Sequence, residues 1–324
     1  MTSAEISQLL IIGVPENGDL AAIEALQPGG VILMGRNAGT PAEVRRLTRR
    51  IQDVCVVPPL IMTDQEGGRV QRLKDGFTAI PSMRELAAQG ANNVGLMAMN
   101  VAAELRVAGL NCNLAPVCDV PKHKDDTVIG DRAFSDNPIR AALSTAEYIR
   151  GAQPNVLCCA KHFPGHGGVG VDSHSGLPVF EGEWEELDAI HLQPFRAAIA
   201  ADVGAIMAGH IAVPAVDATS TPASLSAPII TGLLREALNF RGLVMTDDLE
   251  MGALAEYSDD DIGVRALAAG CDMLMFCHFP AKAKMALDAI IQAQQSGRLD
   301  AARVQDAIAR VQWAKRKFGV VTEN

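Results

Sequence analysis

Short, continuous apolar runs of strand length recur along the whole chain and alternate with helical patterns. Strands that are buried on both faces have this continuous character, whereas half-exposed strands alternate polar and apolar residues. The pattern therefore predicts an α/β fold with buried strands. We count eight such runs, at residues 9–14, 30–34, 60–63, 112–120, 156–160, 205–208, 243–246 and 272–277.

The segments between these runs carry signals for helix starts and ends. Residues 40–43 and 82–85 each form a capping box, and the first has proline at the first helical position. Gly109 ends the helical stripe that follows the second box, and Pro194 predicts another helix start. Asp300 can cap a final helix whose last turn is basic, which suits the negative end of a helix dipole.

Eight buried strands with intervening helices in 324 residues predict a (β/α)8 barrel in a single domain, residues 1–324. A doubly wound open sheet is the main competitor. No linker, repeat or low-complexity tract marks a second domain.

Composition excludes several classes of partner. A formal net charge of −10 argues against a nucleic-acid surface. No apolar run reaches the length of a membrane span, and the N-terminus lacks the pattern of a secretory signal. Several of the seven cysteines lie inside apolar runs, as reduced core residues of a cytoplasmic protein do. We expect no cofactor and no metal, and a monomer is favoured.

Ionisable residues directly follow most of the apolar runs. A single Asp or His after a strand commonly shapes a loop or caps a helix. The coincidence across strands instead predicts a polar pocket at one rim of the barrel, where barrel enzymes assemble their sites. The residues concerned are Arg36, Asp64, Asp119, Lys161, His162, His210, Asp247, Asp248 and His278.

Two of these strand exits suit a reaction at a carbon centre. Asp247 is a candidate nucleophile at the first position after residues 243–246, and capping is the simpler role for Asp248. Asp172 and His174 lie two residues apart, so in an extended segment they point to the same side. A carboxylate beside an imidazole fixes its tautomer and raises its basicity, which suits proton transfer.

With these residues, the chain resembles glycoside hydrolase family 3, and within it the single-domain bacterial β-N-acetylglucosaminidases of peptidoglycan recycling. The resemblance covers nearly the whole chain, and its motifs occur in the family's order. They lie at residues 64–72 (DQEGGRVQR), 130–134 (GDRAF), 161–167 (KHFPGHG), 172–174 (DSH) and 246–251 (TDDLEM).

The resemblance implies a retaining exo-β-N-acetylglucosaminidase that removes terminal N-acetylglucosamine from muropeptide fragments. It implies that Asp247 is the nucleophile and that His174 is the general acid/base, with Asp172 as its partner. The residues implied to hold the non-reducing sugar are Asp64, Arg72, Arg132, Lys161 and His162. The Asp172–His174 pair and the lack of a second domain favour N-acetylglucosamine over glucose. The glycine-rich residues 168–170 predict a loop that closes over the sugar.

Other activities stay open at this point. Phosphorolysis is one, because a histidine admits phosphate where a carboxylate repels it. A Schiff-base lyase could use Lys161, and a non-catalytic sugar-binding protein would have similar strand ends. A metal hydrolase is a further alternative, although its histidines match no helical ligand motif. That alternative would use His162, His166, His174 and His210. The role of His166 is otherwise open, and a hydrogen bond that shapes the loop is the expected one.

Overall fold

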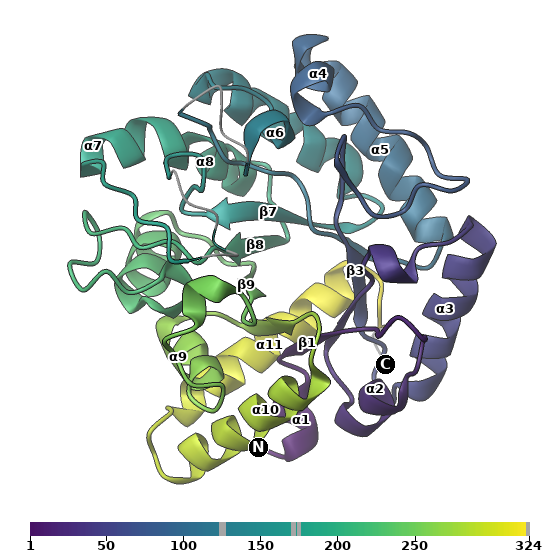
Figure 1. The fold of residues 1–324 in the computed structure, drawn as a ribbon, viewed down its shortest axis with the longest axis vertical. Coiled ribbons are helices and arrows are strands. Elements are labelled where there is room, and N and C mark those ends of the chain that lie inside the picture. Colours follow the sequence, from purple (N-terminus) through teal and green to yellow (C-terminus); the bar gives the residue numbers. More distant parts are fainter. Residues whose placement is uncertain (123–127, 170–172, 174–175, 322–324) are drawn as a thin grey trace.

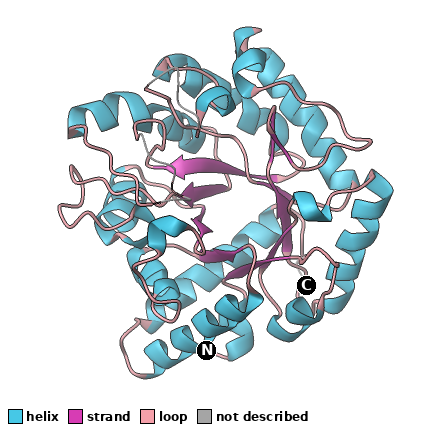
Figure 2. Ribbon diagram, in the orientation of Figure 1, coloured by secondary structure: helices cyan, strands magenta, loops and turns pink. Residues whose placement is uncertain are grey.

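The computed structural model describes residues 1–122, 128–169, 173 and 176–321. Its centre is a closed barrel of parallel strands in the order β1, β10, β9, β8, β7, β6, β3 and β2, with helices around the outside (Figure 1, Figure 2). The predicted (β/α)8 barrel is confirmed, because β1 pairs with β2 on one side and with β10 on the other. The strands are β1 (Leu10–Gly13), β2 (Gly30–Ile32), β3 (Leu60–Thr63), β6 (Cys112–Asn113), β7 (Leu157–Phe163), β8 (Ala205–Ala208), β9 (Leu243–Asp248) and β10 (Met273–Phe276).

Each predicted run contains one barrel strand, but three strand bounds differ in ways that matter. β6 is much shorter than its run, while β7 and β9 continue beyond theirs into charged residues. A small antiparallel hairpin of β4 (Gln65–Gly67) and β5 (Val70–Gln71), which the sequence did not predict, follows β3.

The predicted capping boxes begin α3 and α4, and Asp300 caps α11. The helix expected to start at Pro194 instead begins at Leu192, directly after a π-helix. None of the helices in the described ranges is long and apolar enough to cross a membrane. The α-helices are α1 (Ser3–Ser7), α2 (Ala21–Leu26), α3 (Pro41–Val54), α4 (Met83–Ala88), α5 (Ala91–Val107), α6 (Pro138–Ala152), α7 (Trp184–Glu186), α8 (Leu192–Ala200), α9 (Ile262–Ala269), α10 (Pro280–Gln295) and α11 (Ala301–Lys317), with π-helices η3 (Leu187–His191) and η5 (Pro228–Ala237).

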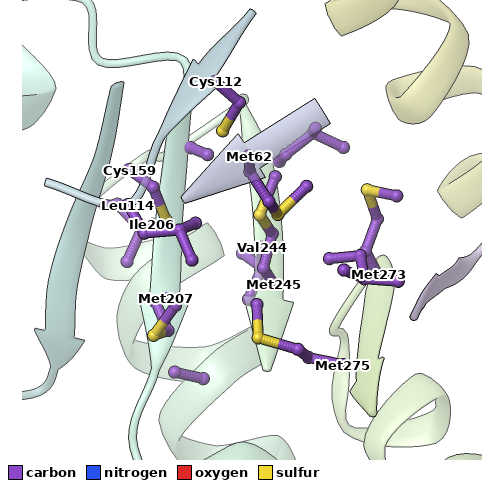
Figure 3. Packing of buried hydrophobic residues seen from close by; sticks show 14 of the residues in the cluster. Met62, Cys112, Leu114, Cys159, Ile206, Met207, Val244, Met245, Met273 and Met275 are labelled. Carbon is purple, nitrogen blue, oxygen red and sulfur yellow. The ribbon is translucent and has the colours of Figure 1, made fainter. Parts of the chain in front are cut away.

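Sulfur-containing side chains fill much of the barrel interior. Met62, Met245 and Met273 point inward from β3, β9 and β10 and are fully buried (Figure 3). Gly30 makes room for two of them, because a Cβ atom there would lie 3.0 Å from Met62 Cε and 3.3 Å from Met273 Cε. Methionine is flexible enough to fill such irregular space. The barrel is therefore a packed core, and any site must lie at one of its ends.

A buried ion-pair network joins the last helix to the residue before β10. Asp272 is fully buried, and its Oδ1 accepts hydrogen bonds from Arg303 at 2.7 Å and from Arg310 at 3.1 Å, both on α11. Its Oδ2 contacts the guanidinium of Arg235 on η5 and accepts the N–H of Val244 at 2.9 Å. A buried carboxylate is tolerable only with partners of this kind. This ion-pair network thereby fixes α11 against β9 and β10.

Candidate active site

A cavity of about 420 Å³ opens at the C-terminal ends of the barrel strands. A larger groove of about 700 Å³ lies elsewhere, beside Asn155 and Phe318, and contains none of the predicted site residues. The polar residues that line the 420 Å³ cavity come from the ends of β3, β7, β9 and β10 and from the segments after β3, β6, β9 and β10. They include Asp64, Glu66, Arg69, Arg72, Arg132, Lys161, Asp247, Asp248, Glu250 and His278.

One wall of this cavity is a buried network of alternating charges. Lys161 Nζ lies 2.6 Å from Asp64 Oδ1 and 2.7 Å from Glu66 Oε1. Arg132 donates two hydrogen bonds of 2.8 Å to the Glu66 carboxylate, and Arg72 lies 3.5 Å from Asp64. Bidentate arginine–carboxylate pairs are strong and fix geometry. The network therefore holds its cations rigidly at the cavity wall.

The charges in the network determine their own ionisation. Burial alone would raise the pKa of Glu66, but Lys161 and Arg132 outweigh it and hold that pKa well below its usual value. Burial alone would lower the pKa of Lys161, but Asp64 and Glu66 raise it instead. Lys161 is thus a firmly protonated ammonium. This is the opposite of the desolvated, neutral amine that a Schiff-base lyase requires.

Glu66 is a functional residue that the sequence analysis left out. It lies within the DQEGG motif, on the unpredicted β4, and it bridges two of the predicted sugar-binding cations. The available signal was that Glu66 is a further charged residue in the short segment after β3, which also contains Asp64 and Arg72. What the sequence alone does not provide is the pairing of Glu66 with residues far along the chain.

Asp247 lies near the end of β9, within the strand and not just beyond it as predicted. Its Oδ1 accepts the backbone N–H of Asp248 at 2.8 Å. Burial alone would raise the pKa of Asp247, but His162, His210 and Lys161 together lower it below its usual value. The carboxylate is therefore ionised at neutral pH, which is the state that a nucleophile needs.

His210 forms a hydrogen bond to the backbone next to Asp247. Its Nδ1 lies 2.8 Å from Ser224 Oγ, and its Nε2 lies 2.9 Å from the backbone oxygen of Asp248. Both ring nitrogens are thus occupied by protein groups. His210 therefore has no free nitrogen for a metal, contrary to its role in the metal-hydrolase alternative.

Asp248 does more than shape the turn that follows it. Its Oδ1 accepts the N–H groups of Glu250 and Cys277, each at 3.2 Å, so it ties β9 to the end of β10. His278 Nε2 lies 3.7 Å from Asp248 Oδ2, and Arg36 lies 3.1 Å from the other ring nitrogen. Burial first, and then the nearby Glu250, raises the pKa of Asp248 to about 7. Asp248 and Glu250 thus add two carboxyl groups to the lining of the cavity.

The loop after β7 is anchored at its start. Asp119 accepts the backbone N–H of His166 at 2.6 Å and contacts Nδ1 of His162 at 2.7 Å. His166 Nε2 lies 3.2 Å from Ser173 Oγ, and Ser173 also accepts the N–H of Ala253 at 2.9 Å. His166 thus makes a hydrogen bond across the loop.

The structure brings five of the predicted site residues to one cavity: Asp64, Arg72, Arg132, Lys161 and Asp247. His162 does not line this cavity itself, but it lies close enough to Asp247 to interact with that carboxylate. Gly170, Asp172 and His174 lie outside the described residues, so the predicted acid/base pair and the closing loop remain predictions.

Comparison with known proteins gives one consistent family. The model of the glycosyl hydrolase family 3 N-terminal domain matches residues 1–314. A protein named beta-hexosaminidase from Methylobacillus flagellatus is 38% identical over 298 residues, which cover 87% of this chain and 83% of that protein.

Solved structures agree with this match. A glycoside hydrolase family 3 beta-N-acetylglucosaminidase from Paenibacillus sp. superposes on 100% of this chain with a TM-score of 0.96 and 36% identity. This chain spans 65% of the length of that protein. A beta-glucoside phosphorylase, at 24% identity and a TM-score of 0.90, shares the fold.

Proposed function

This chain belongs to glycosyl hydrolase family 3 and is a glycosidase, and on that premise we propose that it is a retaining exo-β-N-acetylglucosaminidase. Its proposed substrates are muropeptide fragments that carry a terminal, non-reducing N-acetylglucosamine, such as a disaccharide with 1,6-anhydro-N-acetylmuramic acid. The names of the beta-hexosaminidase and beta-N-acetylglucosaminidase relatives support the sugar. The aglycone rests on the resemblance of the motifs alone.

The observation that carries the proposal is the position of Asp247. An ionised carboxylate ends β9 in the same cavity as the network of Lys161, Asp64 and Arg132. Carboxylates can accept hydrogen bonds from sugar hydroxyls, and the cations can donate to their oxygens. Arg72 Nε is buried without a hydrogen-bond partner among the described residues, so it has a donor to offer. Such a wall can hold a sugar ring with its anomeric carbon towards Asp247.

The proposed reaction has two steps. In the first, an oxygen of Asp247 attacks the anomeric carbon, the bond from that carbon to the aglycone oxygen breaks, and His174 gives that oxygen its proton. In the second, His174 takes a proton from water as the water attacks the same carbon, which releases the sugar and frees Asp247. Two inversions leave the β configuration unchanged. Asp172 keeps the imidazole of His174 oriented and basic.

Phosphorolysis is the second candidate, since a histidine in place of an acidic residue does not repel phosphate. A beta-glucoside phosphorylase has the same fold, so the fold is compatible with phosphorolysis. We further propose a cytoplasmic location, which the seven buried free cysteines support.

A panel of aryl β-glycosides tests the proposal. Glucosides and N-acetylglucosaminides are each assayed with and without phosphate, followed by the anhydro-muropeptide disaccharide. We expect turnover of N-acetylglucosaminides that phosphate does not accelerate, with the β anomer of N-acetylglucosamine released first. A sugar 1-phosphate as the main product would replace hydrolysis by phosphorolysis, and a preference for glucosides would overturn the proposed specificity.

A further inference from the structure

Asp119 is a buried carboxylate in the segment between β6 and η2 (Gly130–Arg132), and the proposed reaction leaves it unused. Its Oδ1 accepts the backbone N–H of His166 at 2.6 Å, and its Oδ2 lies 2.7 Å from Nδ1 of His162. The backbone N–H of His162 lies 3.3 Å from both oxygens. Within the described residues, the hydrogen bonds of this carboxylate thus all go to the segment that follows Lys161.

The ionisation of Asp119 makes it an acceptor only. Burial alone would raise the pKa of Asp119, but His162 and the hydrogen bonds outweigh it and lower that pKa below its usual value. An ionised carboxylate cannot donate, so the hydrogen in the 2.7 Å contact belongs to Nδ1 of His162. In the neutral imidazole, Nε2 then carries the lone pair.

We propose that Asp119 is a positioning residue that fixes His162 as a hydrogen-bond acceptor, so that the sugar must present a donating hydroxyl to Nε2. The tautomer follows from the contacts of Asp119 alone, whereas the identity of the donor as a sugar hydroxyl rests on the proposed function. The His162 side chain is 9% exposed and lies near Asp247, at the end of β9. The lysine and arginine side chains of the cavity can only donate, so His162 adds the complementary polarity.

Nuclear magnetic resonance of the wild-type protein tests the tautomer without any activity. The protein is labelled with ¹⁵N at histidine and measured at slightly alkaline pH, and the His162 signals are assigned by their loss in His162→Gln. We expect the proton on Nδ1 and none on Nε2. A proton on Nε2, in either a neutral or a charged ring, overturns the proposal.

Asp119→Asn then tests whether the carboxylate sets this state. The two backbone N–H groups need an acceptor, which holds the amide oxygen at the position of Oδ1 and places the amide N–H₂ against Nδ1 of His162. Nδ1 must then accept, and the proton moves to Nε2. The equivalent aspartate-to-asparagine change in the serine protease triad produces the wrong histidine tautomer in the same way. The matched control is Asp217→Asn, because Asp217 is also buried and accepts hydrogen bonds from Ser226 and Thr219, but does not line the cavity.

Deoxyfluoro substrates link the tautomer to substrate binding, because fluorine cannot donate a hydrogen bond. Aryl N-acetylglucosaminides with fluorine in place of the hydroxyl group at C3, C4 or C6 are compared with the parent. In wild type and in Asp217→Asn, we expect one position at which fluorine lowers kcat/KM by about 10-fold, the loss of one hydrogen bond. In Asp119→Asn, kcat/KM for the parent falls and the penalty at that position disappears, since Nε2 of His162 now carries the proton and donates.

The outcomes separate this proposal from the proposed function. If Asp119→Asn is folded and carries the His162 proton on Nε2, unchanged fluorine penalties would overturn the acceptor role of His162. If the wild type turned over no N-acetylglucosaminide, the proposed function would fail while the ¹⁵N result still decided the tautomer.

Discussion

The ammonium of Lys161 and the carboxylate of Glu66 lie 2.7 Å apart, and both side chains are almost completely buried. Glu66 also binds Arg132 through both of its oxygens. One carboxylate from the hairpin after β3 thus holds a cation from β7 and a cation from η2. The two predicted sugar-binding cations consequently depend on a residue that need not touch the sugar.

Glu66→Gln should therefore damage both binding and stability. Removal of this charge leaves Lys161 paired with Asp64, while Arg132 loses its ion pair with Glu66 and keeps a hydrogen bond to the backbone oxygen of Val128. Breaking a buried ion pair in this way costs about 3–5 kcal/mol. We expect a lower free energy of unfolding in urea and a rise in KM for an aryl N-acetylglucosaminide. The control is Glu147→Gln, which breaks an exposed pair with Arg150 on α6. Wild-type stability and KM in Glu66→Gln would show that the network is dispensable.

Asp247→Ala should abolish turnover, because no other group in the proposal forms the glycosyl-enzyme. We expect kcat for an aryl N-acetylglucosaminide to fall by about 10⁴-fold or more, while the circular dichroism spectrum stays that of the wild type. Asp288→Ala serves as the control, since Asp288 is an exposed carboxylate on α10 that pairs with Lys284. Turnover near the wild-type level in Asp247→Ala would remove Asp247 as the nucleophile.

His174→Ala should affect substrates according to their leaving groups. A natural sugar aglycone needs a proton as it departs, whereas an activated phenol departs without one. We expect the first step to slow by about 10²–10⁴-fold for the former and far less for the latter. Both are measured by pre-steady-state kinetics on the same preparation, so each protein is its own control. Equal losses for the two substrates would contradict the acid/base role.

Lys315 predicts a pH dependence of stability. Burial lowers the pKa of this α11 lysine from 10.5 to about 7, and its ammonium nitrogen lies 2.7 Å from Gln8 Oε1. Between pH 7 and 10.5 the unfolded chain binds this proton and the folded chain does not. The contribution of Lys315 to stability therefore rises with pH across that window, by up to about 1.4 kcal/mol per pH unit.

Urea unfolding of Lys315→Met at several pH values from 7 to 9 measures this contribution. The difference in the free energy of unfolding between the variant and the wild type cancels the other titrating groups. We expect the variant to be the more stable protein near pH 7 and its advantage to shrink as the pH rises. Lys317→Met, at a more exposed position on the same helix, should show no such trend. A constant difference for Lys315→Met would mean that Lys315 is protonated in the folded state.

Local signals in the sequence predicted the barrel strands and several helix starts. The Thr40, Ser82 and Asp300 caps depend on residues two or three positions away, so the sequence contains them completely. The predicted strand ends were less accurate where contacts with residues far along the chain determine how far a strand continues. β7 continues through Lys161 because Asp64 and Glu66 neutralise it there, whereas a charge after an apolar run predicted the strand's end.

The shortening of β6 has a different cause. Pro116 lies within its predicted range and has no N–H group to donate to a neighbouring strand, so the pairing beyond Asn113 is irregular and includes only an isolated bridge between Val117 and Lys161. The cavity wall was predicted residue by residue, but its internal pairing was not. Glu66 and Asp119 act through contacts with residues more than 40 positions away, and no local pattern indicates such contacts.

The pairing of β1 with β10 has a consequence for how the chain is made. Residues 10–12 pair with residues 274–276, so the barrel cannot close until the later segment has been synthesised. At about 5–20 residues per second, a ribosome exposes the unpaired edge of β1 for tens of seconds. Asp272 extends the delay, because Arg303 and Arg310 emerge later still. The edge of β1 is therefore unpaired during most of synthesis, and a chain that ended before α11 would lack both arginines that bind Asp272 from that helix.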